Sequence, residues 1–201
     1  MTRQLWLRGE RIVLRQWHQD DLVPFARLNA DPQVRRFFPS RLTRAESDAE
    51  AARAQALFAE KGWGFLVLEL PEITEFAGVI GLFPPPYQTH FTPCIEIGWR
   101  LLPEYWGQGY ATEAAQRLLD LGFAERQLMD IVAMTAVDNR PSRAVMERLG
   151  MQYDPTDDFD HPSLPEGHPL RRHVLYRLKR RDWKQRSGDA ARVRIQRRAR
   201  R

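Results

Sequence analysis

The most informative part of this sequence is a pair of glycines between a predicted strand and a predicted helix, in the stretch Trp106-Gly107-Gln108-Gly109-Tyr110-Ala111-Thr112. Glycine has no Cβ atom, so the backbone of such a turn can approach a ligand closely. The helix that follows adds free N–H groups and the positive end of its dipole at the same place. These features together are typical of a turn that binds phosphate or pyrophosphate, although glycine pairs also occur in turns that bind nothing.

Two common nucleotide-binding motifs do not account for this turn. A P-loop requires Gly-x-x-x-x-Gly-Lys-Ser/Thr, and the sequence contains no such string. A dinucleotide fingerprint requires a third glycine, but this chain has Thr112 there. That fingerprint also belongs to an early βαβ unit, whereas the segments upstream of the turn have an antiparallel character.

The spacing of apolar residues and the capping signals predict an α+β protein around a mixed sheet. Thr43 and Glu46 form a capping box, Asn139 caps a later helix, and Gly150 ends it. We expect strands at 11–15, 64–70, 76–83, 94–101, 130–137, 151–153 and 173–178, helices at 20–28, 44–61, 110–125 and 140–149, and a long loop at 154–169.

Composition narrows the class of protein. A chain of 201 residues with 43% hydrophobic residues suits one domain with a full core, or one domain plus a tail. Cys94 is the only cysteine, so there is no internal disulfide framework and a reducing compartment fits. We see neither an apolar stretch long enough to span a membrane nor a signal-peptide core, and therefore expect a cytoplasmic protein.

The net charge of +5 is unevenly distributed. Residues 177–201 contain twelve Lys or Arg and two Asp or Glu, so residues 1–176 carry a net charge of −5. A basic tail can attract phosphates, but it is also typical of a solvated, disordered terminus. We expect a disordered tail at 187–201, with a weak nucleic-acid or ribosome contact as the alternative.

The glycine turn and its surroundings resemble the GNAT superfamily of N-acetyltransferases, in particular the ribosomal-protein-alanine acetyltransferase-like (Rim) branch. The family motif, Arg/Gln-x-x-Gly-x-Gly/Ala, falls on residues 106–111, with Trp106 in place of the usual Arg or Gln. Glu96-Ile97-Gly98-Trp99 before it and Asn139-Arg140-Pro141-Ser142 after it have the family spacing. The resemblance covers residues 8–180 and implies a GNAT fold, a mixed and mostly antiparallel sheet splayed in the middle with helices on both faces.

The resemblance also implies a coenzyme A site. Backbone amides of the glycine turn would hold the pyrophosphate, and backbone groups of the strand ending at residues 99–101 would pair with the pantetheine arm. Asn139 would bond the pantetheine, and Ser142 would lie near the sulfur. The implied cofactor-binding residues are Trp99, Arg100, Leu101, Trp106, Gly107, Gln108, Gly109, Tyr110, Ala111, Thr112, Asn139 and Ser142.

Acetyl transfer to an amine requires a base for the amine and a hydrogen-bond donor for the leaving thiolate. Glu96 is the candidate base. Ser142 is the candidate donor, with Tyr176 or Tyr153 as the fallback. Simpler interpretations remain: Glu96 as an exposed carboxylate, Asn139 as a plain helix cap and Ser142 as a surface serine. With one thiol and no paired histidine evident, direct attack in a ternary complex fits better than an acetyl-enzyme.

The expected function is acetyl transfer from acetyl-CoA to a primary amine, on a peptide or a small molecule. The acids of the 157–160 loop would suit a cationic amine. The spacing of the histidines matches no common zinc pattern, so no metal is expected. The main alternative is a non-catalytic acyl-CoA-binding module on the same fold, because fold alone does not establish chemistry. We expect a monomer or homodimer with no membrane contact.

Overall fold

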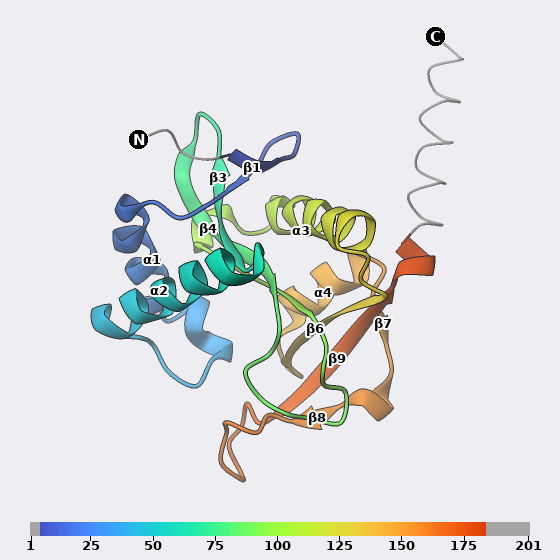
Figure 1. Ribbon diagram of the computed structural model, residues 1–201. Helices are drawn as coiled ribbons and strands as arrows, with labels where there is room; N and C mark the ends of the chain where they lie inside the picture. The colour runs from blue at the N-terminus through green and yellow to red at the C-terminus, as the bar shows by residue number, and fades with distance from the viewer. Residues whose placement is uncertain (1–4, 184–201) are drawn as a thin grey trace, which may run out of the picture.

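The computed structural model describes residues 5–183 (Figure 1). The predicted basic tail at 187–201 lies outside this range. Its disorder and its contact with nucleic acid therefore stay predictions. No helix in the described range is both long enough and apolar enough to cross a membrane.

The described chain folds as an α+β protein around one mixed sheet, as predicted. The sheet order is β1-β2-β3-β4-β5-β6-β9-β7, with β8 paired to β9. Every neighbouring pair is antiparallel except β5 and β6, which are parallel. The elements are β1 Leu5–Arg8, β2 Val13–Arg15, α1 Leu22–Ala30, α2 Arg44–Lys61, β3 Phe65–Leu70, β4 Thr74–Phe83, β5 Glu96–Leu101, α3 Tyr110–Asp120, β6 Asp130–Ala136, α4 Arg140–Arg148, β7 Gln152–Tyr153, β8 Phe159–Asp160 and β9 Arg172–Lys179.

Helices cover both faces of the sheet (Figure 1). Successive side chains of a strand point to opposite faces, and β3 shows this directly. Its Leu66 and Leu68 pack into a core that includes Leu118 of α3, whereas Val67 packs into a second core with Phe25 of α1. The α1 and α2 layer and the α3 and α4 layer are therefore held by separate apolar clusters.

The sheet splays between its two halves. β5 and β6 pair at a single position, Glu96 opposite Val132, where the Val132 N–H donates to the Ile95 carbonyl over 2.9 Å. By contrast, β6 and β9 pair along the whole of β6. The two strands of the parallel pair then separate, which opens a gap with unpaired backbone in the middle of the sheet.

Two short strands differ from the prediction. β1 was not predicted, and β8 lies inside the stretch predicted as a loop at 154–169. That stretch folds back because residues 159–160 pair with the start of β9. The helix predicted at 110–125 is α-helical to Asp120 and then continues as one π-helical turn, Leu121–Glu125.

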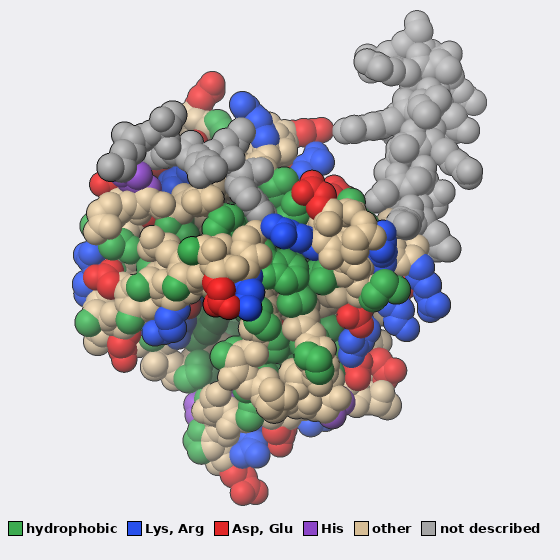
Figure 2. Space-filling model, viewed as in Figure 1, with side chains coloured by type: hydrophobic (Ala, Val, Ile, Leu, Met, Phe, Trp, Pro, Cys, Tyr) green, Lys and Arg blue, Asp and Glu red, His purple; other side chains and the backbone are tan. Residues whose placement is uncertain are grey.

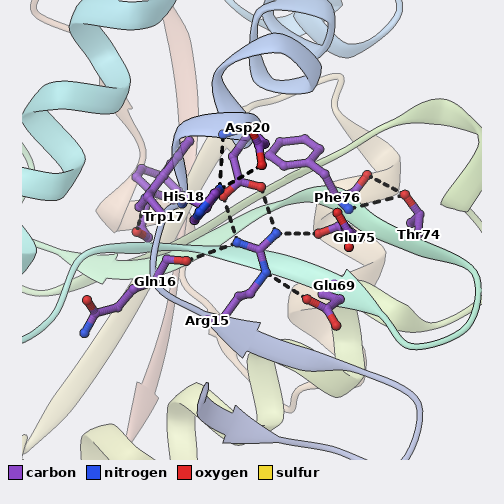
Figure 3. A network of polar contacts seen from close by, with 11 residues as sticks. Arg15, Gln16, Trp17, His18, Asp20, Glu69, Thr74, Glu75 and Phe76 are labelled. Atoms are coloured by element: carbon purple, nitrogen blue, oxygen red, sulfur yellow. Dashed lines mark hydrogen bonds and ion pairs between the residues drawn. The ribbon is translucent and has the colours of Figure 1, made fainter. Parts of the chain in front are cut away.

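A buried arginine ties the start of the first helix to the sheet. Asp21 is buried and accepts from both terminal nitrogens of the buried Arg15 over 2.7 Å. The Arg15 Nε also donates to Glu69 over 2.8 Å, and its Nη2 donates to the Glu75 carbonyl over 2.7 Å (Figure 3). This network links the start of α1 to β2, β3 and β4.

Candidate active site

The glycine turn has the backbone conformation that only glycine adopts easily. Gly107 and Gly109 have φ angles of 72° and 84°, in the left-handed region. Arg11 braces the turn from the β1–β2 connection: its Nη1 donates to the Gln108 carbonyl over 3.0 Å, and its Nε pairs with Glu113 of α3 over 2.9 Å. Nothing in the sequence indicated this role for Arg11, because 97 residues separate it from Gln108.

The turn presents a row of free donors. The backbone N–H groups of residues 107–112 have no acceptor within the described chain, and the first α3 amide that does is Glu113, which bonds the Gly109 carbonyl over 3.0 Å. Residues 107–109 are exposed, and the row opens into a cavity. This is the donor arrangement expected of a pyrophosphate site.

Trp106 has a structural role in this turn. Its indole Nε1 donates to the Leu101 carbonyl over 2.8 Å, so the side chain ties the turn to the end of β5. This bond uses one of the two lone pairs of the Leu101 carbonyl oxygen. The bond explains what an aromatic residue does at a position where a cation is usual.

The cavity beside the glycine turn has a volume of about 590 Å³. It lies between the turn, the segment after α1 and the first turns of α4. Its charged lining residues are Arg36, Arg100 and Arg148, and no Asp or Glu lines it. We call it the arginine cavity. Arg100 is paired with Glu50, so Arg36 and Arg148 supply the net positive charge. Free N–H groups together with this positive charge fit a polyanion such as the pyrophosphate of coenzyme A.

The phase of the β4–β5 ladder determines which part of β5 faces the gap. The Leu102 N–H donates to the Ala77 carbonyl over 2.9 Å, and ladder bonds alternate along an antiparallel strand. The backbone groups of Gly98 and Arg100 therefore face β4, while those of Trp99 face the gap. By the same alternation the backbone of Leu101 also faces the gap, so Trp99 and Leu101 are the two expected β5 residues that can present backbone groups to a ligand.

Arg100 has a structural role in addition to the expected one. Its guanidinium is buried, pairs with Glu50 of α2 over 2.6 Å and donates to the Asn29 side chain of α1 over 2.7 Å. The side chain thus ties β5 to α1 and α2, while the residue also lines both cavities. Its contact with the cofactor stays a prediction.

A second cavity, of about 540 Å³, lies on the α1 and α2 side of the gap. Eight aromatic residues line it, and we call it the aromatic cavity. The eight aromatic residues are Trp17, Phe25, Phe37, Phe38, Phe65, Phe83, Tyr87 and Trp99. On the face of the molecule shown in Figure 2, hydrophobic side chains run through the middle, with charged side chains scattered around them.

The two cavities meet at the gap. Trp99, Asn139 and Ser142 line both of them, together with Phe37, Phe38 and Arg100. A ligand bound along the glycine turn and a second ligand in the aromatic cavity would therefore come together beside the start of α4. The sequence-predicted residues Asn139 and Ser142 lie at this junction.

Glu96 projects into the aromatic cavity from the start of β5. It lies directly opposite Phe83 of β4 and makes no hydrogen bond or ion pair within the described chain. Burial raises the pKa of its carboxyl group to about 8, because the charged form loses hydration that no protein group replaces. Glu96 is thus a half-buried acid that lines a cavity, and not a fully exposed strand carboxylate.

Asn139 and Ser142 differ in how free their side chains are. The Asn139 Oδ1 accepts from the Ser142 N–H over 3.4 Å, and its Nδ2 donates to Thr135 over 2.8 Å. The plain N-cap role is therefore real, and it leaves one amide hydrogen of Asn139 for a ligand. The Ser142 hydroxyl has no partner within the described chain and faces both cavities.

Tyr176 does not reach the junction. It is buried on β9, and its hydroxyl donates to Glu147 over 3.0 Å and accepts from Arg143 over 3.2 Å. Neither cavity is lined by Tyr176 or by the neighbouring Tyr153, whose ring stacks on it at 5.3 Å. Both fallback donors are therefore replaced by Ser142 alone.

The loop at 154–169 contributes His161 to the site instead of its acids, and β9 adds His173 beside it. His161 and His173 line the aromatic cavity with their rings 4.9 Å apart, and burial lowers the pKa of His173 to about 4. The acids pair with the chain itself: Asp157 contacts Arg177, and Asp160 contacts two arginines. Within residues 5–183, no group of three or more His, Cys, Asp or Glu side chains is placed to hold a metal ion.

Comparison with known proteins agrees with this geometry. A family model described as an acetyltransferase (GNAT) domain matches residues 11–152. The chain belongs to the GNAT acetyltransferase family. It is 28% identical over 174 residues to YnaD, an uncharacterized N-acetyltransferase of Bacillus subtilis, covering 87% of this chain and 96% of YnaD.

Solved structures of other family members have the same fold. The acetyltransferase from Agrobacterium tumefaciens is 30% identical with a TM-score of 0.69, over 86% of this chain and 92% of that one. RimJ of Mycobacterium smegmatis, solved in complex with CoA-disulfide, has a TM-score of 0.67 over 84% of this chain and 81% of RimJ. At 21% identity, the likeness to RimJ concerns the fold alone. The protein is an enzyme that transfers an acetyl group from acetyl-CoA.

Proposed function

We propose that this GNAT enzyme acetylates a primary amine by direct attack in a ternary complex, with Glu96 as the base. The observation that carries the proposal is the unpaired Glu96 carboxyl group in a cavity that meets the arginine cavity at Ser142. Acetyl-CoA supplies the acyl group as a thioester. The division of the site into two cavities supports separate places for donor and acceptor.

The arginine cavity would hold the donor. Backbone N–H groups of residues 107–112 would bond the pyrophosphate, and Arg36 and Arg148 would add positive charge. The free backbone of Trp99 and the remaining amide hydrogen of Asn139 would bond the pantetheine arm in the gap. These contacts would place the thioester beside the Ser142 hydroxyl.

The raised pKa of Glu96 reduces the cost of removing the amine's proton. A lysine-like ammonium has a pKa near 10.4 and an ordinary Glu near 4.3, so transfer between them costs about 8 kcal/mol at roughly 1.36 per unit. With a Glu96 pKa of about 8, the mismatch falls to about 3 kcal/mol. After the proton has moved to Glu96, the amine is neutral and can attack the thioester at the junction of the two cavities.

Ser142 would stabilise the leaving thiolate by donating a hydrogen bond to the sulfur. Its hydroxyl is free, and it sits on the first turn of α4, where the N-terminal dipole of the helix also favours negative charge. An acetyl-enzyme on Cys94 is disfavoured, because this thiol lines neither cavity and burial raises its pKa to about 11.

Membership of the Rim branch, with a protein N-terminus as acceptor, remains part of this proposal. An α-amine has a pKa near 8, which Glu96 would match closely. The resemblance of the glycine turn and its surroundings to the Rim branch motivates a peptide arm in any substrate screen. The alternative acceptor within the same proposal is a small cationic amine.

Initial-rate kinetics with free-thiol detection test the proposal. We expect coenzyme A release to depend on added amine, with intersecting double-reciprocal lines and an acetamide product of the expected mass. Parallel lines, with acetyl-protein formed in the absence of amine, would replace direct attack by an acetyl-enzyme. The Cys94→Ser variant serves as the matched control and should retain full activity.

A further inference from the structure

We propose that the acceptor is an arylalkyl monoamine, in which one primary amine is joined by a short alkyl arm to an aromatic ring. This inference rests on the proposed function, because it assigns the occupant of the aromatic cavity. It follows from the order of groups along one face of β5. The Glu96 carboxyl group comes first, and the Phe83 and Phe65 rings lie next to it. The ion pair between Arg100 and Glu50 comes last.

The amine position is set by Glu96. Glu96, Gly98 and Arg100 occupy alternate positions on one face of β5, at a spacing of about 7 Å between successive members. Glu96 is the only carboxylate of the cavity lining without a protein partner in the described chain. A single ammonium would supply the partner that it lacks.

The ring position is set by Gly98. A Cβ atom there would lie 3.0 Å from the Phe83 ring and 3.7 Å from the Phe65 ring, so these rings fill the space above the glycine. The two rings pack with centroids 4.5 Å apart. They form an apolar floor one step from Glu96, where an aromatic ring on a short arm would stack.

The far end of the cavity disfavours a second ammonium. Both oxygens of Glu50 accept hydrogen bonds from Arg100, so this carboxylate is already satisfied. Arg53 lines the same end, is exposed and has no ion pair in the described chain, which leaves that end with a net positive charge. A diamine or polyamine that placed one ammonium at Glu96 would direct the other toward arginines.

The test compares three amines of similar reach: phenethylamine, hexylamine and cadaverine. We expect kcat/KM to fall by about 10-fold from phenethylamine to hexylamine, and by about 10-fold again to cadaverine. Equilibrium binding of each amine to the enzyme–coenzyme A complex should follow the same order. Binding and turnover of hexylamine or cadaverine equal to those of phenethylamine would overturn the inference.

Two variants locate the effect, each with a matched control outside both cavities. Phe83→Leu should reduce the preference for phenethylamine over hexylamine about 5-fold, while Phe91→Leu leaves it unchanged. Arg53→Glu should raise kcat/KM for cadaverine relative to hexylamine about 5-fold, while Arg181→Glu, with the same change in net charge, does not. Equal effects of variant and control would contradict the assignment.

The binding measurement separates this inference from the proposed function. If phenethylamine binds best and no amine releases coenzyme A, the proposed reaction fails and the assignment of the cavity stands. If amines are acetylated but the aryl amine neither binds nor reacts better than hexylamine, the reaction stands and the assignment fails.

Discussion

The arginine cavity and the aromatic cavity are similar in volume and share six lining residues, yet they differ in charge. Three arginines and no acid line the first, while the second has eight aromatic residues and the unpaired Glu96. One strand, β5, borders both. The contrast supports our proposal that the splayed sheet separates a polyanionic donor from a mostly apolar acceptor, with the chemistry where the two strands separate.

Glu96→Gln tests the acceptor side and should have the largest effect. Gln fills the same space but cannot accept the amine's proton, so kcat should fall about 100-fold or more at pH 8.5. The equilibrium affinity for acetyl-CoA should stay unchanged, because Glu96 does not line the arginine cavity. A parallel loss of acetyl-CoA affinity would break the distinction between the cavities.

Gly109→Val tests the donor side. A β-branched residue at a φ of 84° is strained, and its Cβ would contact Arg11, so the turn should shift and the Kd for acetyl-CoA should rise about 10- to 100-fold. Gly167→Val is the control, since Gly167 has a φ of 78° with nothing within 4 Å of its Cβ position. Equal acetyl-CoA affinities in the two variants would contradict the proposed site.

Ser142→Ala tests the junction. Loss of one hydrogen bond to a developing thiolate corresponds to about 1.5 kcal/mol, so kcat should fall about 10-fold. The Kd of acetyl-CoA and the amine affinity should change little, because the bond forms chiefly as charge develops on the sulfur. A rise in either dissociation constant with kcat intact would assign Ser142 to binding instead.

Arg36→Ala should have the smallest effect. Removing one exposed cation from the arginine cavity should weaken acetyl-CoA binding about 3-fold, and high salt should abolish the difference. Arg181→Ala, which lies outside both cavities, should leave acetyl-CoA binding unchanged at any salt concentration. A salt-independent effect of Arg36→Ala would point to packing.

Local signals in the sequence predicted local structure well. Thr43 accepts from the Glu46 N–H as the capping box requires, and Gly150 takes a φ of 78° at the end of α4. Such features depend on residues a few positions apart. The splaying of β5 from β6 was predicted only through the family resemblance. Strand separation leaves backbone groups unpaired, and unpaired backbone groups produce no pattern in a single sequence.

Long-range contacts could not be predicted in the same way. Whether Arg100 faces the ligand or Glu50 depends on the packing of α2 against β5, across 50 residues of chain. The sequence made Tyr176 a reasonable donor, but in the structure β9 is buried and the Tyr176 hydroxyl donates its hydrogen bond to Glu147. The aromatic cavity is likewise assembled from segments between Trp17 and His173 that carry no common motif.

The pH dependence of kcat/KM for the amine tests the central claim, that the Glu96 carboxylate in the aromatic cavity accepts the amine's proton. The raised pKa means that the base form appears as the pH rises through about 8. The wild-type profile should therefore rise to about pH 8 and then level off, while Glu96→Gln should continue to rise toward the amine's own pKa near 10.4. The same break near pH 8 in both proteins would contradict the account.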